Sequence, residues 1–195
     1  MSGPSSDTTG VTHCRFSGIE SLGINGNGKT GLVLQLYYAD NLLFRDMVIT
    51  SNSDLTIDSA EFWDSRFEDC AFVSCSGTAG STTQPVMWLR NSATASGFGN
   101  SAGNTNQILL RNVLFEAFGT GALWIGQGTG NASNPNGFYI TDCKFEADAM
   151  AGGPYLSTDN TTKNVYGEHL YVFAGGFASG FSTAQTLISL FGANH

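Results

Sequence analysis

Apolar and polar residues alternate in short runs along this chain, and one seven-residue pattern recurs six times. In each copy a central polar residue is preceded by an apolar residue at −2 and followed by apolar residues at +1 and +3, except that Gly167 takes the −2 position of the last copy. The six copies are GIESLGI (18–24), LFRDMVI (43–49), RFEDCAF (66–72), LLRNVLF (109–115), YITDCKF (139–145) and YGEHLYV (166–172). Alternation on both sides of a polar corner predicts two short strands joined by a turn in every copy.

The spacing of these copies predicts a solenoid. Their central residues are Ser21, Asp46, Asp69, Asn112, Asp142 and His169, which are 25, 23, 43, 30 and 27 residues apart. Such unequal intervals fit coils of similar size with loops inserted at particular corners. A further apolar run lies between copies, at 32–36, 55–57, 86–89, 122–125, 155–156 and, near the C-terminus, 187–190. We therefore predict an all-β fold, a right-handed single-stranded parallel β-helix of about six coils with three short strands each.

Two columns of the alignment predict how the coils stack. The +3 column, with Ile24, Ile49, Phe72, Phe115 and Phe145, should form an internal ladder of apolar side chains, because parallel strands lie about 4.8 Å apart. The −1 column begins Glu20, Arg45, Glu68, Arg111, and opposite charges on neighbouring strands attract each other. We expect the charges to form an ion-pair ladder on the surface.

The repeats also predict the domain organisation and the state of the cysteines. We expect a single domain over residues 1–195, with an irregular segment at 1–17, regular coils at 18–172 and a terminal coil or cap at 173–195. Cys70 and Cys143 share a column with Val113 between them, which places them about 10 Å apart and beyond the reach of a disulfide. They should be buried, reduced thiols.

Composition and charge limit the classes of binding partner that we expect. The net charge is −8, and the eight Lys and Arg residues form no cluster in the sequence, which argues against nucleic acid and against an anionic membrane surface. No apolar run reaches the roughly 20 residues that span a bilayer, and the first residues do not resemble a signal peptide. No metal-ligand spacing is present, so we expect neither a metal nor another cofactor.

The repeats resemble the pectate-lyase-like right-handed parallel β-helix superfamily, which includes pectin-degrading enzymes and phage tailspike depolymerases. The resemblance is carried by residues 18–49 and by NGFYITDCKF (136–145). It implies an extended polysaccharide bound along one face, where loops rise beside the first strand of each coil. The N-T-D, paired Asp and G-H-G segments of polygalacturonases are absent, and the basic residue and Ca²⁺-binding acids of pectate lyases are not recognisable.

Long loops at 91–106, 126–136 and 157–163 follow the additional strands and should form walls beside one face. On that face the alternation points Gln35, Asp58, Met87 and Trp124 outward, and Arg90 and Gln127 lie at the ends of two strands. The candidate substrate-binding residues are Gln35, Arg90, Trp124 and Gln127. Trp124 would offer an aromatic platform to a sugar ring if it faces solvent, although the alternative, that it faces inward, has equal weight.

Three acids spaced three residues apart, Asp58, Glu61 and Asp64, are the candidate catalytic residues. Hydrolysis of a glycosidic bond needs two carboxyl groups about 5–9.5 Å apart, and a corner could bring two of these acids within that range. The same acids are equally explained as solvated turn residues.

The sequence thus leaves two functions open. One is a carbohydrate-binding or polysaccharide-cleaving module, a glycosidase or lyase if it is an enzyme, in the manner of a phage tailspike. The other is a structural or adhesive β-helix of a virion fibre or surface protein, without chemistry of its own. Both predict an extracellular or virion-associated protein, as a homo-oligomer such as a trimer or as a fragment of a longer chain.

Overall fold

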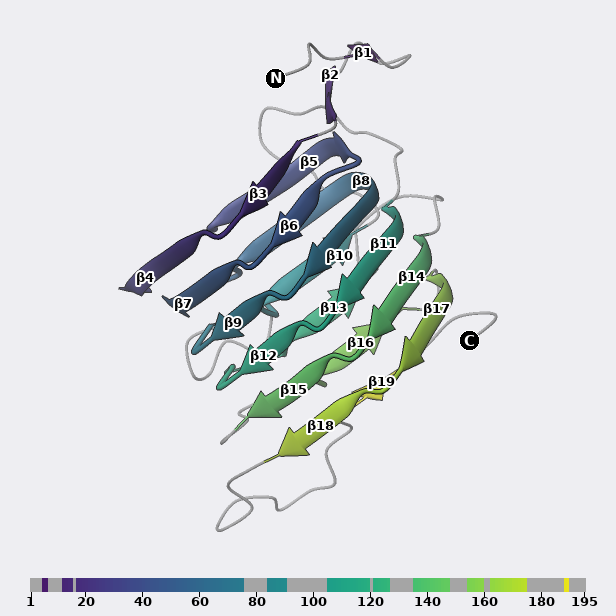
Figure 1. Ribbon diagram of the computed structural model, residues 1–195. Helices are drawn as coiled ribbons and strands as arrows, with labels where there is room; N and C mark the ends of the chain where they lie inside the picture. Colours follow the sequence, from purple (N-terminus) through teal and green to yellow (C-terminus); the bar gives the residue numbers. More distant parts are fainter. Residues whose placement is uncertain are drawn as a thin grey trace.

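The structure, a computed structural model, is a parallel β-solenoid (Figure 1). It describes residues 5–6, 12–15, 17–75, 84–90, 105–119, 121–126, 135–147, 154–159, 162–174 and 188–189. Within these ranges every regular element is a strand. The predicted all-β class and the stacking of parallel coils are therefore confirmed.

Each coil contributes a strand to each of three faces, and Figure 1 shows the second and third faces as successive, aligned strands. The first face contains β2 (Thr12–Arg15), β5 (Leu34–Asp40), the start of β8 (Ile57–Glu68), β10 (Met87–Arg90), β13 (Leu123–Ile125), β16 (Leu156–Thr158) and β19 (Ile188–Ser189), with β1 (Ser5–Ser6) antiparallel to β2. The second contains β3 (Gly18–Glu20), β6 (Leu43–Arg45), the end of β8, β11 (Asn106–Arg111), β14 (Asn136–Thr141) and β17 (Lys163–Glu168). The third contains β4 (Gly23–Lys29), β7 (Val48–Asn52), β9 (Ala71–Val73), β12 (Leu114–Glu116), β15 (Lys144–Ala147) and β18 (Tyr171–Ala174).

The prediction of about six coils is wrong in number, because about four turns are complete. The coils over residues 34–52, 57–73, 87–116 and 123–147 have paired strands on both sides. The repeats beginning at Gly18 and Tyr166 lie in the outermost coils, where β3, β4, β17 and β18 each pair on one side among the residues that the structure describes. The sequence pattern recurs in these outer coils without showing that each has a single neighbour.

The predicted internal ladder is confirmed residue by residue. Ile24 pairs with Ile49, Ile49 with Phe72, Phe72 with Phe115 and Phe115 with Phe145. The rings of Phe72 and Phe115 are stacked with centroids 5.2 Å apart, and those of Phe115 and Phe145 are 5.3 Å apart. These three rings are completely buried, so like residues stack in sequence order through the centre of the solenoid.

The polar corner has a specific backbone cause. The central residues of all six copies, including His169 and Asn112, have a positive φ between 51° and 55°. This left-handed conformation turns the chain between the second and third faces, and Asn and Asp adopt it more readily than most residues. The column of polar residues in the sequence is therefore the column of turns.

The cysteine prediction is confirmed for the residues whose side chains the structure describes. Cys70, Cys75 and Cys143 are buried free thiols. The amides of Leu114 and Lys144 bond the carbonyls of Cys70 and Val113, which places the two predicted cysteines two coils apart. Burial raises the pKa of the Cys143 thiol to about 11, so it is protonated and unreactive at neutral pH.

Candidate functional site

The first face carries the column of outward residues in which the sequence placed its candidate site. Gln35 pairs with Asp58, Asp58 with Trp88, and Trp88 with Trp124. Their strand neighbours on the opposite side, such as Ile57 and Leu89, lie in the core. The structure thus brings Gln35, Asp58 and Trp124 into one column. Met87, which was also predicted to point outward, instead lies in the core with no exposed surface, because Trp88 takes the outward position.

Asp58 is the centre of a compact polar cluster. Its side chain is 5% exposed, and it accepts hydrogen bonds from the Tyr37 hydroxyl and from Arg90, whose Nε lies 2.6 Å from Oδ1. The second Asp58 oxygen is also bonded by the Arg90 Nη2. The Arg90 guanidinium in turn lies 4.3 Å from the centroid of the Trp88 ring. Both oxygens of this carboxylate are therefore engaged with the protein.

The same cluster changes the acidity of Tyr37. Burial raises the pKa of Tyr37 to about 12, and the hydrogen bond to the Asp58 carboxylate acts in the same direction. A tyrosine that donates to a carboxylate keeps its proton, since losing it would leave two negative charges side by side. Tyr37, Asp58 and Arg90 therefore hold β5, β8 and β10 together.

Trp124 is closely covered. It is 7% exposed, its Nε1 donates to the Pro154 carbonyl at 3.1 Å, and its ring meets Trp88 edge-on at 6.0 Å between centroids. Little of the ring is open to solvent, although the residue lies on the outward side of the strand. Gln127, the fourth candidate binding residue, lies outside the described residues.

The other two acids lie at the corner within β8. Glu61 and Asp64 have φ values of 49° and 48°, so both occupy left-handed turn positions between the first and second faces. Glu61 is buried and Asp64 is exposed. The three candidate catalytic residues thus have three different environments, and a catalytic pair among them stays a prediction.

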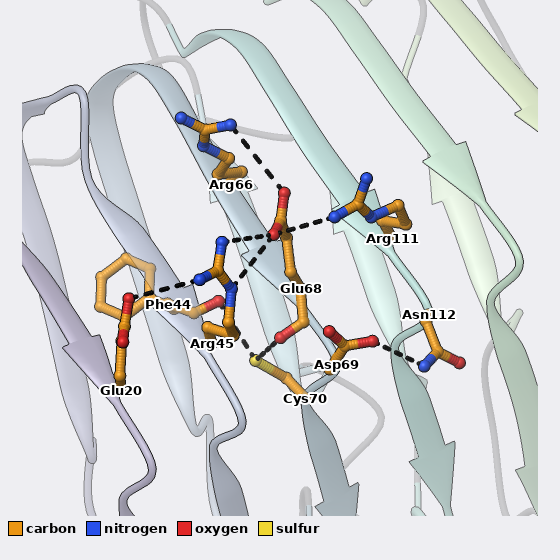
Figure 2. A network of polar contacts seen from close by, with 9 residues as sticks. All are labelled: Glu20, Phe44, Arg45, Arg66, Glu68, Asp69, Cys70, Arg111 and Asn112. Atoms are coloured by element: carbon orange, nitrogen blue, oxygen red, sulfur yellow. Dashed lines mark hydrogen bonds and ion pairs between the residues drawn. The ribbon is translucent and has the colours of Figure 1, made fainter.

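The second face carries the ion-pair ladder that the alternating charges predicted (Figure 2). The Glu68 side chain is 3% exposed, and its Oε2 lies 3.1 Å from Arg45 Nη2 and 3.0 Å from Arg111 Nη2. Arg45 also contacts Glu20 at 3.6 Å. Sequence reasoning missed a third arginine, since Arg66, from the same strand as Glu68, lies 4.0 Å from Oε1.

An aromatic groove further along the second face was also missed. Tyr139 and Tyr166 are paired in register, are 49% and 55% exposed, and stack with centroids 5.2 Å apart and planes 12° from parallel. They belong to an open groove of about 720 Å³, lined by Leu109, Tyr139, Ile140, Thr141, Val165, Tyr166, Gly167 and Glu168. The available signal was the −3 column of the repeat, in which both tyrosines lie.

The described part of the chain contains no group of three His, Cys, Asp or Glu side chains arranged to hold a metal ion. Within the same residues there is no helix long and apolar enough to cross a membrane.

Comparison with known proteins identifies a phage protein of similar fold. No family model matches the chain, and no curated protein matches it. Among solved structures, a protein titled ORF18 from Geobacillus virus E2 superimposes with a TM-score of 0.62 at 17% identity. The match covers 85% of this chain and 32% of that protein, so this chain spans about a third of its length. At this identity the likeness shows the fold, and this chain is a parallel β-solenoid with a phage protein as a structural neighbour.

Proposed function

We propose that this chain is a virion-associated β-solenoid that binds a glycan at the groove formed by Tyr139 and Tyr166. The observation that carries the proposal is the pair of stacked tyrosines, each about half exposed, in an open groove on a regular sheet. Large aromatic side chains exposed together on a soluble domain are typical of binding surfaces.

The chemistry of the groove suits a sugar. A tyrosine presents an apolar ring edge or face together with a hydroxyl that donates and accepts hydrogen bonds, which matches the mixed surface of a pyranose. Thr141 and Glu168 add a hydroxyl and a carboxylate to the lining. Tyr139 and Tyr166 lie on two successive coils, about 4.8 Å apart along the axis, so a ligand that follows the axis would contact both side chains.

The phage neighbour supports association with a virion, since this chain shares its fold with a viral protein. The resemblance to the pectate-lyase-like superfamily, with its tailspike depolymerases, supports an extended glycan as the ligand. The contacts of the candidate catalytic acids favour binding without cleavage, because both oxygens of Asp58 are already bonded to Tyr37 and Arg90.

A glycan array followed by calorimetry on the strongest binder tests the proposal. We expect Tyr139→Ala and Tyr166→Ala each to weaken binding about tenfold or more, because each loses a stacking surface worth about 1–2 kcal/mol. Tyr171→Ala is the matched control, because Tyr171 is 53% exposed but lies on the third face. Binding that none of the three changes, or no binding to any glycan on the array, would refute the proposal.

A reducing-sugar assay on the glycans that bind separates binding from cleavage. We expect no turnover by the wild-type protein. If turnover occurs, Glu61→Gln and Asp64→Asn identify the responsible acid, and Asp58→Asn is interpreted only beside its unfolding curve, since it leaves the partly buried Arg90 without its carboxylate.

A further inference from the structure

Three of the eight basic residues of this acidic chain converge on one buried carboxylate. Arg66 lies on the same strand as Glu68, and Arg45 and Arg111 lie on the coils on either side of it. All three guanidinium groups are within 4.0 Å of the Glu68 carboxylate. The cluster also includes Glu20, which contacts Arg45, and Asp46, whose charge acts on Arg45, so it contains three positive and three negative groups. Its three arginines nevertheless form a patch of concentrated guanidinium groups on a protein whose net charge is −8.

Two of these arginines have donors to spare. A guanidinium has five N–H donors. Within the described residues, Arg66 and Arg111 each make one polar contact, the ion pair with Glu68, at 4.0 Å and 3.0 Å respectively. Their side chains are 56% and 52% exposed, whereas Glu68 lies beneath them at 3%. Figure 2 shows their guanidinium groups on opposite sides of the Glu68 carboxylate. Glu68 orients both groups and leaves most of their hydrogen-bonding capacity facing solvent.

This patch adjoins the tyrosine groove. Arg66 pairs with Leu109, and Leu109 pairs with Tyr139, so one outward column runs from the arginine to the two tyrosines. In the next column Arg111 pairs with Thr141, which also lines the groove. A chain molecule lying along the solenoid axis in the groove would reach both guanidinium groups within one or two coils.

We infer that Arg66 and Arg111 form a binding site for an anionic group carried by the ligand of the tyrosine groove. The chemical class is a planar or tetrahedral oxyanion, since a guanidinium pairs with carboxylate, sulfate or phosphate through parallel N–H···O bonds. The inference rests on the proposed function and deepens it, because it makes the glycan a negatively charged one.

The experiment compares four probes of matched length: a hyaluronan oligosaccharide for carboxylate, a dextran sulfate oligosaccharide for sulfate, a poly(glycerol phosphate) for phosphate, and a neutral dextran oligosaccharide. We expect at least one anionic probe to bind the wild-type protein more tightly than dextran, and its affinity to fall as salt is raised. The combined Arg66→Gln and Arg111→Gln variant should bind that probe about tenfold or more weakly. The anionic probe that binds best identifies the oxyanion.

Lys144→Gln is the matched control, because it removes an exposed cation from the third face. It should bind like the wild-type protein, and circular dichroism should show all variants folded. The inference is overturned if dextran and the anionic probes bind equally, or if the double arginine variant binds like the wild type. In either case the proposed function survives as long as Tyr139→Ala reduces binding. If the arginine variant loses binding but Tyr139→Ala does not, the proposed function fails and the anion site remains. If none of the four probes binds, this inference is rejected, and the glycan array decides the proposed function separately.

Discussion

Two buried carboxylates in this protein, Asp58 and Glu68, form hydrogen bonds and ion pairs with residues of neighbouring coils. Asp58 joins Tyr37 and Arg90 from the coils on either side of it, and Glu68 does the same with Arg45 and Arg111. A buried carboxylate is expensive unless paired charges and hydrogen bonds compensate it. In both clusters the partners sit on neighbouring strands, so losing the register would leave the carboxylate uncompensated. We infer that these two residues help to fix the alignment of adjacent coils.

At the residue scale, the shifted pKa of Tyr37 predicts a pH dependence of stability. The hydroxyl ionises near 10 in the unfolded chain and at about 12 in the folded protein. Its contribution to stability is therefore complete below pH 10 and is lost progressively as the pH rises towards 12.

Denaturant unfolding at pH 8, 10 and 11.5, with the wild type beside Tyr37→Phe, measures this contribution. The unfolding free energy of the wild type should fall relative to that of the variant as the pH rises above 10. The other five tyrosines are common to both proteins, so their titration cancels in the difference. A difference that stays constant over this range would show that Tyr37 does not ionise differently on folding.

At the scale of the strand, the apolar ladder is a continuous row within the core. On the third face, short strands such as β9 and β12 contribute one inward side chain each, and its flat ring stacks on the ring of the next coil. A strand of three residues is too short to be stable alone, so its stability comes from the neighbours above and below. Phe115 is completely buried and stacks on a phenylalanine ring on either side.

We therefore expect Phe115→Ala to lower the unfolding free energy by about 3–5 kcal/mol, the usual cost of deleting a buried aromatic ring. Val48→Ala, on the same face but pointing outward with 44% of its surface exposed, should lower it by less than about 1 kcal/mol. Equilibrium urea unfolding of the two variants checks both values. Equal costs at the two positions would contradict the internal ladder.

On the scale of the whole molecule, stability should vary along the axis. Each coil contacts only its neighbours, as in other solenoids. The coils over 34–52, 57–73, 87–116 and 123–147 are paired on both sides, whereas β3, β4, β17 and β18 have one neighbour each within the described ranges.

Hydrogen exchange followed by mass spectrometry should therefore show a gradient. Peptides from β9, β11 and β12 should exchange slowest, and peptides from β3, β4, β17 and β18 should exchange fastest, because outer strands open without breaking a second set of ladder bonds. Uniform protection along the chain, or greatest protection at either end, would mean that the outer coils are covered by something else, such as another subunit.

The sequence alone determined the fold and the internal columns. Strand alternation makes the face of each side chain a property of its position, and stacking parallel strands then forces equivalent positions such as Phe72 and Phe115 together. The ion-pair ladder from Glu20 to Arg111 followed from the same alignment. The outer limits of the solenoid did not follow, because the sequence of a repeat is the same whether the coil has one neighbour or two.

The tertiary structure decided what the outward side chains do. Tyr37, Asp58 and Arg90 are brought together, Trp124 is covered at Pro154, and Tyr139 and Tyr166 line an open groove. The physical reason is that an internal position in a solenoid is enclosed by its own column, whereas the surroundings of an outward position depend on how neighbouring coils and corners lie over it. Alternation along one strand contains no information about that second direction.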